Sequence, residues 1–449
     1  MSQSKETNAG QVEPKQHLQT SLIGIESKAR RFRDYKFKNL SNMLNQMNLI
    51  ESWSKVNKRA ARGVDKVSAK EFEANLFEEV AMLEKELKAD AYKARLIRRT
   101  YIEKPNGDKR PLGIPVVRDK LLQALCSSIL EAIYEPKFYD FRFGYRRDKG
   151  AKGAVKHLRE QLTFGKYGYV VEADIKGYFQ NINHEKLLEM LEHDIADKRF
   201  IRLISKWLKA GTLTEENIVE RPHKGTQQGG VISPILANIY LHYILDMWFE
   251  KKVKREAEGE CMMVAYADDF VCAFRFRGDA VRFMESLEAR FKAFGLELAK
   301  DKTKMIKFSR FSKDRNEDFD FLGFTFRWKE SKKGKDYVTQ TSAKKKFRQA
   351  VKRMKEWLMK NRHRRLENII NQINSKLRGY YNYYGIRGNS KMLWEMDELI
   401  NRLLYKWLNK RSQRRSFTWK AYNRMITKKY VLIKPFMESR HEQIVMTFC

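Results

Sequence analysis

Two adjacent aspartates, Asp268 and Asp269, interrupt a stretch that is otherwise almost entirely apolar, residues 261–274. The apolar runs on either side, 262–265 and 270–274, have the length and composition of buried strands. Burial of both runs forces the short polar segment between them into a tight turn. The sequence therefore predicts a β-hairpin that presents two carboxylates together at its tip.

Two like charges at one turn are costly unless cations neutralise them, although a plain solvated Asp-Asp turn has the same local sequence. A third acid favours the functional interpretation. Asp174 ends a predicted strand, 167–175, and adjacent strands would bring it beside Asp268. Three carboxylates could hold two Mg²⁺ ions roughly 3.5–4 Å apart, as in phosphoryl-transfer sites. Glu172 lies on the same strand but deeper, so we rank it lower.

A glycine-rich turn, 224–230, precedes a predicted buried helix, 231–249, that Pro234 starts. Glycine lets the backbone approach a ligand closely, and a helix N-terminus favours anions. The turn lacks the Walker spacing. Together with the acids it is a candidate shelf for a nucleotide. Lys104, Arg110 and Lys302 are candidate triphosphate contacts, although each alone is most often a solvated surface cation.

The charge balance points to a polyanionic partner. The chain has 91 Lys+Arg against 56 Asp+Glu, a formal charge of +35, and residues 327–449 hold 32 of those cations with only 9 acids. Aromatic residues are interleaved there, so nucleic-acid binding is favoured over a helical domain with merely solvated cations. A membrane surface is the rival partner, but no apolar stretch is long enough to span a membrane.

The rest of the sequence contains both helical and strand patterns. Helical periodicity marks 20–90, 117–135, 279–294 and the region from 342 onward. Strands are predicted at 95–102 with a turn at 105–108, and at 319–327. The polar start, to about residue 18, predicts a mobile segment without a secretory signal. Four scattered cysteines predict neither disulfides nor a zinc site, which is typical of a reduced, intracellular protein.

The motifs, taken in order, resemble those of group II intron-encoded reverse transcriptases, also called maturases, of the bacterial type without a C-terminal endonuclease. The similar stretches are 63–65, 102–107, 110–115, 171–179, 225–238, 266–269, 294–296, 302–303 and 321–324.

The resemblance implies an α+β right-hand polymerase: fingers, a palm of antiparallel sheet flanked by helices, and an all-helical thumb or maturase domain. We expect an N-terminal extension at 1–40, partly disordered, then fingers with a template-covering loop at 41–160, palm at 161–330 and thumb at 331–449. The implied activity is RNA-directed DNA synthesis from dNTPs on a primer. Two Mg²⁺ ions, for which Mn²⁺ could substitute, would be held by Asp174, Asp268, Asp269 and the Ile175 carbonyl.

The resemblance also implies contacts to the nucleotide from Lys104, Arg110, Gln228, Gly229 and Lys302, and a sugar-excluding role for Phe179, which is otherwise an ordinary core residue. Expected nucleic-acid contacts are Arg59, Arg62, Lys344, Lys345, Lys346, Arg348, Arg411, Arg414 and Arg415. The expected partners are intron RNA or another RNA template and a DNA primer or target, with no membrane, in the bacterial cytoplasm near nucleoid or RNA.

Four positions depart from the family pattern: Gln180, Gln227, Arg147 and Ala299 stand where Asp, Pro, Pro and Asn are usual. None of them is a predicted metal ligand. Two roles remain open, an intron maturase that also assists splicing and retrohoming, and a host-adopted copy used in defence or repair. The reading frame alone does not choose between them, and it leaves the oligomeric state open. Retron and diversity-generating enzymes fit less well, because Ser233-Pro234 follows the shelf.

Overall fold

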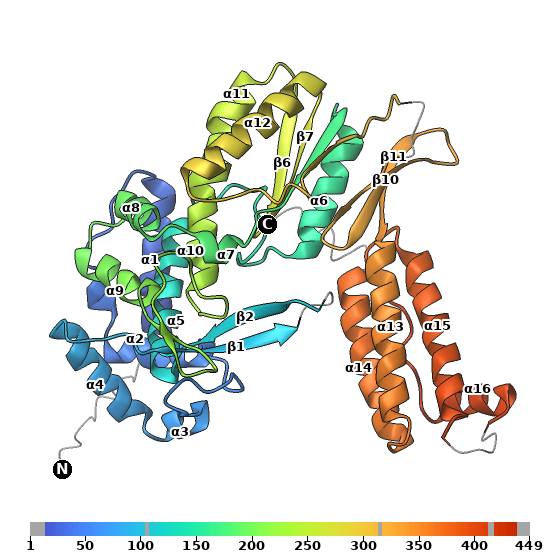
Figure 1. Cartoon of the computed structure of the whole chain (residues 1–449), viewed down its shortest axis with the longest axis horizontal. Helices are drawn as coiled ribbons and strands as arrows, with labels where there is room; N and C mark the ends of the chain where they lie inside the picture. Colours follow the sequence, from blue (N-terminus) through green and yellow to red (C-terminus); the bar gives the residue numbers. More distant parts are fainter. Residues whose placement is uncertain (1–13, 104–106, 313–316, 412–416, 438–449) are drawn as a thin grey trace, which may run out of the picture.

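A computed structural model describes residues 14–103, 107–312, 317–411 and 417–437. The chain builds three successive parts, which follow the colour bar of Figure 1 from blue through yellow to red. These are a largely helical N-terminal part, a central sheet covered by helices, and a C-terminal helical domain. Among the described helices, none is both long and apolar enough to cross a membrane.

The N-terminal part surrounds one deeply buried helix, α5 (Val117–Tyr134), whose residues are almost all shielded from solvent. Helices α1 (Pro14–Arg31), α2 (Gln46–Ser52), α3 (Ala69–Ala74) and α4 (Leu76–Lys88) cover it, with short turns η1 (Leu40–Met43) and η2 (Trp53–Lys55). The expected mobile start falls on residues 1–13, outside the described residues, and on the beginning of α1.

The predicted hairpin in this part is confirmed. Strands β1 (Ile97–Glu103) and β2 (Lys109–Ile114) pair antiparallel from Arg98↔Ile114 to Glu103↔Lys109. Two short strands, β4 (Thr212–Leu213) and β5 (Val219–Glu220), extend the sheet in the order β2-β1-β4-β5. In Figure 1 this hairpin reaches out of the N-terminal part toward the side on which the helical domain lies.

The central sheet is antiparallel, in the order β6-β7-β3-β8. Its strands are β3 (Tyr169–Ala173), β6 (Cys261–Tyr266), β7 (Asp269–Phe274) and β8 (Lys304–Lys307). Because side chains alternate along a strand, Val170, Val264 and Val271 pack with α6 (Ala151–Phe164). Their neighbours on the other face join the main core with α12 (Arg277–Ala293). Burial on both faces explains the continuous apolar runs around the two aspartates.

The helices between β3 and β6 are α7 (Tyr178–Asn181), α8 (His184–Asp194), α9 (Lys198–Leu208), α10 (Ser233–Leu241) and α11 (Lys254–Glu256). The single helix predicted over 231–249 is wrong in detail. It starts at Ser233, with Pro234 in its first turn, and continues after Leu241 into two π-helical segments, η3 (His242–Asp246) and η4 (Phe249–Val253).

A third sheet, in the order β11-β10-β9, lies in the chain between the central sheet and the helical domain. The strand predicted over 319–327 is two strands, β9 (Phe319–Phe321) and β10 (Phe324–Glu330). Leu322 and Gly323, both at positive φ, form the turn between them. Strand β11 (Asp336–Ser342) pairs with β10 over seven residues. A domain boundary at 330 would therefore divide a hairpin, and the helices begin only at Lys344.

The C-terminal domain has a hydrophobic core of its own. Its helices are α13 (Lys344–Asn361), α14 (Leu366–Tyr384), α15 (Ser390–Leu408) and α16 (Trp419–Lys428). Figure 1 shows α13, α14 and α15 side by side below the β10–β11 hairpin. The α+β class predicted from the sequence is confirmed, with an antiparallel sheet flanked by helices and an all-helical C-terminal domain.

Candidate active site

The two aspartates lie at a hairpin tip, as predicted. Tyr266 pairs with Asp269, so the loop between β6 and β7 consists only of Ala267 and Asp268. Ala267 has φ +54°, a conformation that costs a residue with a Cβ atom of order 1 kcal/mol or more. A strained backbone of this kind persists only where the surroundings hold it in place.

Strand β3 places Asp174 next to this tip. Ala173 pairs with Phe270, so the next residue, Asp174, follows the end of β3 opposite Asp269, the first residue of β7. Neighbouring strands lie ~4.8 Å apart. The sequence suggested Asp268 as the neighbour of Asp174, whereas the register puts Asp269 opposite it and Asp268 on the loop.

The three carboxylates interact electrostatically. Desolvation raises the pKa of Asp268, and the negative charge of Asp174 raises it further. Desolvation, followed by repulsion from Asp268 and Asp174, raises the pKa of Asp269 to about 6. Carboxylates that are desolvated and repel one another in this way are stabilised in their ionised form by a bound cation.

The donor set fits divalent cations, which prefer carboxylate oxygens. Within the described residues, however, no three His, Cys, Asp or Glu side chains are already arranged to hold a metal ion. The ammonium of Lys302 lies 2.5 Å from Oδ2 of Asp174. It therefore neutralises a negative charge that a bound metal ion would otherwise neutralise. Glu172 is paired with Lys304 at 2.9 Å, deeper in the sheet.

A fully buried ion pair supports the strained turn from behind. Arg142 and Asp246 have no exposed side-chain surface. Arg142 donates through Nε and, at 2.6 Å, through Nη2 to the Asp246 carboxylate, and its Nη1 donates to the Ala267 carbonyl at 3.0 Å. Asp246 ends the π-helical segment η3, a type of irregularity frequent near functional sites. Sequence reasoning missed this pair.

The backbone at Gly144 completes the support. A Cβ atom there would lie 2.2 Å from the Ala267 nitrogen, so only glycine fits against the turn. Asn238 of α10 donates to the Gly144 carbonyl at 2.7 Å. One continuous helical element, α10 followed by η3, thus binds Gly144 through Asn238 and Arg142 through Asp246. Both contacts support the turn at Ala267.

Phe179 lies beside this cluster, half-buried on α7. Its ring makes an edge-to-face contact with Tyr145, with centroids 6.4 Å apart. Desolvation and then the charge of Asp268 raise the pKa of Tyr145, whereas Arg110 lowers it. Tyr145 therefore lies among Phe179, Asp268 and Arg110. Sequence reasoning did not single out Tyr145, although it lies two residues before Arg147, one of the four departures from the family pattern.

The glycine-rich turn packs against β2, the strand that carries Arg110. Gly113 donates its N–H to the Gln228 carbonyl at 2.8 Å, and Gly229 has φ +110°. Three consecutive side chains each have a buried polar atom that finds no hydrogen-bond partner among the described residues: Thr226 Oγ1, Gln227 Nε2 and Gln228 Oε1. Orphaned buried polar atoms are uncommon and mark a place where a ligand can bind.

The other predicted contacts are scattered over the molecule. Lys104 lies outside the described residues. Ile175 is buried and bridges to Leu298. Arg59 is exposed, and Arg62 donates to the Lys66 carbonyl at 3.2 Å. Arg98 of β1 and Lys120 of α5 hold this loop by hydrogen bonds to its carbonyls.

The basic residues of the helical domain separate into groups. Lys344, Lys345 and Arg348 line a groove beside β10 and β11, whereas Lys346 acts electrostatically on Asp269. Arg411 donates to the carbonyls of Arg362 and Arg364 at 2.6 and 2.7 Å, so its guanidinium already ties helix ends together. Arg414 and Arg415 lie outside the described residues.

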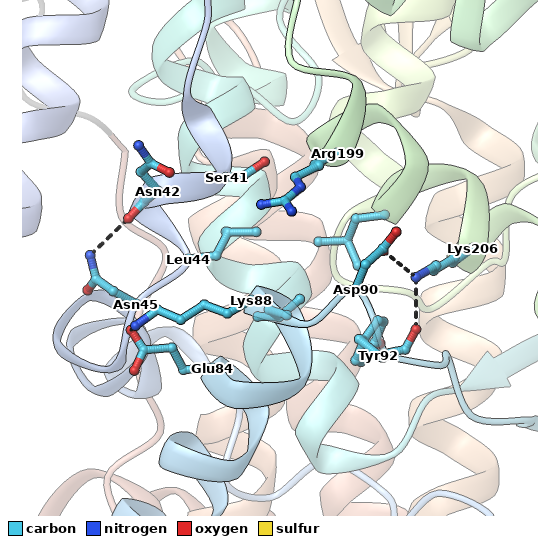
Figure 2. A pocket seen from close by; sticks show the side chains of 12 residues that line it. Ser41, Asn42, Leu44, Asn45, Glu84, Lys88, Asp90, Tyr92, Arg199 and Lys206 are labelled. Carbon is cyan, nitrogen blue, oxygen red and sulfur yellow. Dashed lines mark hydrogen bonds and ion pairs between the residues drawn. The ribbon is translucent and has the colours of Figure 1, made fainter.

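A second, polar pocket lies far from the carboxylates in the fold, between η1, α4 and α9 (Figure 2). Most of its charged groups are paired: Lys206 bonds to Asp90 and to the Tyr92 carbonyl, and Lys88 pairs with Glu84. The bonds of Lys206 connect α9 to the segment that follows α4, whereas the Lys88–Glu84 pair lies within α4. The pocket holds none of the residues predicted to act on a nucleotide.

The sequence of this chain matches two protein families. The family "Reverse transcriptase (RNA-dependent DNA polymerase)" matches residues 102–326, and "Group II intron, maturase-specific domain" matches residues 344–425. The second match begins where α13 begins. Both expectations from the resemblance, a reverse transcriptase followed by a maturase domain, are thus confirmed.

Individual proteins are also similar to this chain. The group II intron-encoded protein LtrA of Lactococcus lactis subsp. cremoris is 41% identical over 183 residues, 40% of this chain and 30% of LtrA. Protein YkfC of Escherichia coli is 30% identical over 319 residues, 64% of this chain and 81% of YkfC. An uncharacterized 91 kDa protein in a Schizosaccharomyces pombe cob intron is 43% identical over 158 residues, 35% of this chain and 19% of that protein.

The match to LtrA covers less than a third of that protein, and the match to YkfC covers most of its length. A family model that spans half of the chain, and that includes all three carboxylates and the strands that hold them, decides the assignment. The chain belongs to the reverse transcriptases, and it carries the maturase-specific domain of group II intron proteins.

Proposed function

We propose that this chain extends a primer 3′-hydroxyl with dNTPs on an RNA template, and that it binds intron RNA to assist splicing and retrohoming. One observation carries the polymerase proposal. Three mutually repelling carboxylates meet at a strained, clamped hairpin tip, beside a half-buried aromatic ring and a glycine-rich shelf with unpartnered polar atoms.

In this proposal, Asp174, Asp268 and Asp269 hold two Mg²⁺ ions, with the Ile175 carbonyl as an additional ligand. When bound, the ions supply Lewis acidity to the attacking hydroxyl and neutralise charge on the leaving pyrophosphate. Lys302, now paired with Asp174, is placed to exchange that carboxylate for a phosphate, since both partners are anions. Reverse transcriptases generally use divalent metal ions, and Mg²⁺ is the ion that we propose for this chain.

The remaining groups orient the nucleotide. Arg110 projects from β2 within electrostatic range of Asp268, which suits a triphosphate bound between them. Gln228 and Gly229 offer the shelf, and Lys104 would add a further cation. The ring of Phe179 is placed to exclude a ribose 2′-hydroxyl by steric contact, with Tyr145 buttressing it.

The test of the polymerase is RNA-templated primer extension by the purified chain with Mg²⁺, with Mn²⁺ and with a chelator. We expect extension with either ion and none with chelator. Extension that persists in chelator would overturn the metal-dependent proposal. The maturase role has a separate test, which is binding and splicing of an intron RNA encoded beside the gene. The absence of such an RNA would instead favour the host-adopted alternative.

A further inference from the structure

The sheet formed by β9, β10 and β11 has two chemically different faces. Phe319, Phe326 and Trp328 point into the hydrophobic core beneath the sheet. The alternate residues form the other face, where Thr325 pairs with Asp320 and Thr341, and Arg327 with Thr339. The outward face is therefore made of hydroxyl and charged side chains.

The first turn of α13 closes this face into a groove of about 730 Å³. That volume lies within the range of about 300–1,000 Å³ that is usual for ligand sites. Lys344, Lys345 and Arg348 enter the groove from the helix, since residues three and four apart share a helix face. Lys329 and Arg327 enter from the sheet.

The charges in the groove are unbalanced. Five cations and two carboxylates line it. Asp318 pairs with Arg327, and Asp320 accepts a hydrogen bond from Thr325 Oγ1 at 2.5 Å but keeps its negative charge. The other four cations, Lys329, Lys344, Lys345 and Arg348, make no ion pair with any residue in the described part of the chain. The free N–H groups at the start of an 18-residue helix add positive potential at the same end.

This groove is distinct from the active site. Lys346, two residues after Lys344, lies on a different face of α13. Its side chain lies near Gly323 in the β9–β10 turn, and its charge acts on Asp269. Helix α13 thus separates two basic surfaces, one toward the carboxylates and one toward the outward face of the sheet.

We propose that the groove binds a sugar–phosphate segment of RNA that is not the template–primer duplex being copied. The unpaired cations match phosphates. The hydroxyls of Thr325 and Thr339 donate within the protein and can still accept a hydrogen bond from a 2′-hydroxyl group, which DNA lacks. The inference deepens the proposed function, because it assigns RNA binding to a surface separate from synthesis. RNA binding in the groove and DNA synthesis at the carboxylates can therefore be tested independently.

The decisive variants are two matched triples on the same helix. The groove variant is K344Q/K345Q/R348Q. The control is K352Q/R353Q/K355Q, which removes the same charges from exposed positions outside the groove. Each protein is saturated with a template–primer duplex, and binding of a second, short, labelled single-stranded RNA is then measured across salt concentrations.

We expect the wild-type chain and the control to bind the second RNA while saturated. The groove variant should bind it about tenfold or more weakly, with a log–log salt slope smaller by ~0.7 for each lost phosphate contact. Its KM for template–primer in extension should stay unchanged, whereas K346Q should raise that KM and leave the second RNA bound.

Three results would overturn the groove proposal: displacement of the second RNA by template–primer, equal losses in both triples, or equally tight binding of a DNA strand of the same sequence. Failure of the proposed function would look different. The wild-type chain would then extend no primer, whether or not the second RNA bound.

Discussion

At the scale of single residues, Arg142 connects the protein core to the reaction. Its guanidinium is held without solvent contact between the Asp246 carboxylate and the Ala267 carbonyl. Because removing one partner leaves a buried charge uncompensated, Arg142→Met should lower the free energy of unfolding by about 3–5 kcal/mol. It should also slow primer extension, on the order of 10²-fold, through misplacement of the turn.

A double variant separates these two effects. Arg142→Met with Asp246→Leu removes both charges and should recover most of the stability, because an apolar pair of similar volume replaces a buried ion pair well. Extension should remain slow, since the Ala267 carbonyl still lacks its donor. Chemical unfolding and single-turnover extension measure the two quantities. Recovery of both would mean that the ion pair stabilises the fold without positioning the turn.

Phe179 carries the second prediction at this scale. Phe179→Ala removes the ring that contacts Tyr145. The variant should incorporate ribonucleotides, which we expect the wild-type chain to exclude. Incorporation of rNTP relative to dNTP by each protein gives the measurement. A variant that extends with dNTPs and still rejects rNTPs would place sugar selection elsewhere and leave Phe179 as a core residue.

At the scale of elements, Asp119 fastens α5 to the segment before β1. It accepts hydrogen bonds from Tyr92 Oη at 2.7 Å and from the Arg95 N–H at 3.0 Å. Desolvation raises the pKa of Asp119 to about 6, although those bonds oppose the rise. A carboxyl whose pKa is higher in the folded state than in the unfolded state costs stability as it ionises, so stability falls as pH rises from about 4 through about 6.

Asp119→Asn removes this titration. Relative to the variant, the wild-type chain should lose up to about 3 kcal/mol of unfolding free energy between pH 4 and pH 7, because one pKa unit corresponds to ~1.4 kcal/mol. Denaturant unfolding of both proteins across that range measures the difference. A difference that is constant with pH, or that changes in the opposite direction, would contradict the predicted shift.

The sequence predicted elements whose signal is local. The β6–β7 tip, the β1–β2 hairpin and α5 follow from apolar runs, turn residues and periodicity within short windows. The Arg142–Asp246 pair joins residues 104 positions apart. Arg142 stands between Phe141 and Phe143, and no local pattern there marks it as one half of a buried ion pair. The π-helical segment that places Asp246 leaves no mark on helical periodicity, and β11 is polar enough to resemble a loop.

At the scale of the whole molecule, charge separates the binding surfaces from the reacting centre. The three proposed metal-binding acids meet at one hairpin tip, and most of the excess positive charge lies in residues 327–449. Asp174→Asn and Asp269→Asn should therefore abolish DNA synthesis and leave RNA affinity nearly unchanged, because RNA binding relies on cations elsewhere. Binding of an intron RNA by filter retention checks this expectation. A large loss of affinity in either variant would show that the carboxylate site also holds the RNA.

The central claim is that the carboxylates at the β6–β7 tip perform the synthesis, and one comparison tests it directly. Primer extension on an RNA template is measured for the wild-type chain, for Asp268→Asn and for Glu172→Gln, a control acid on β3 that pairs with Lys304. Asp268→Asn should reduce extension by orders of magnitude, because an amide cannot supply the charge of a metal-binding carboxylate, whereas Glu172→Gln should stay within a few-fold of wild type. Normal extension by Asp268→Asn, or an equal loss in both variants, would contradict the assignment.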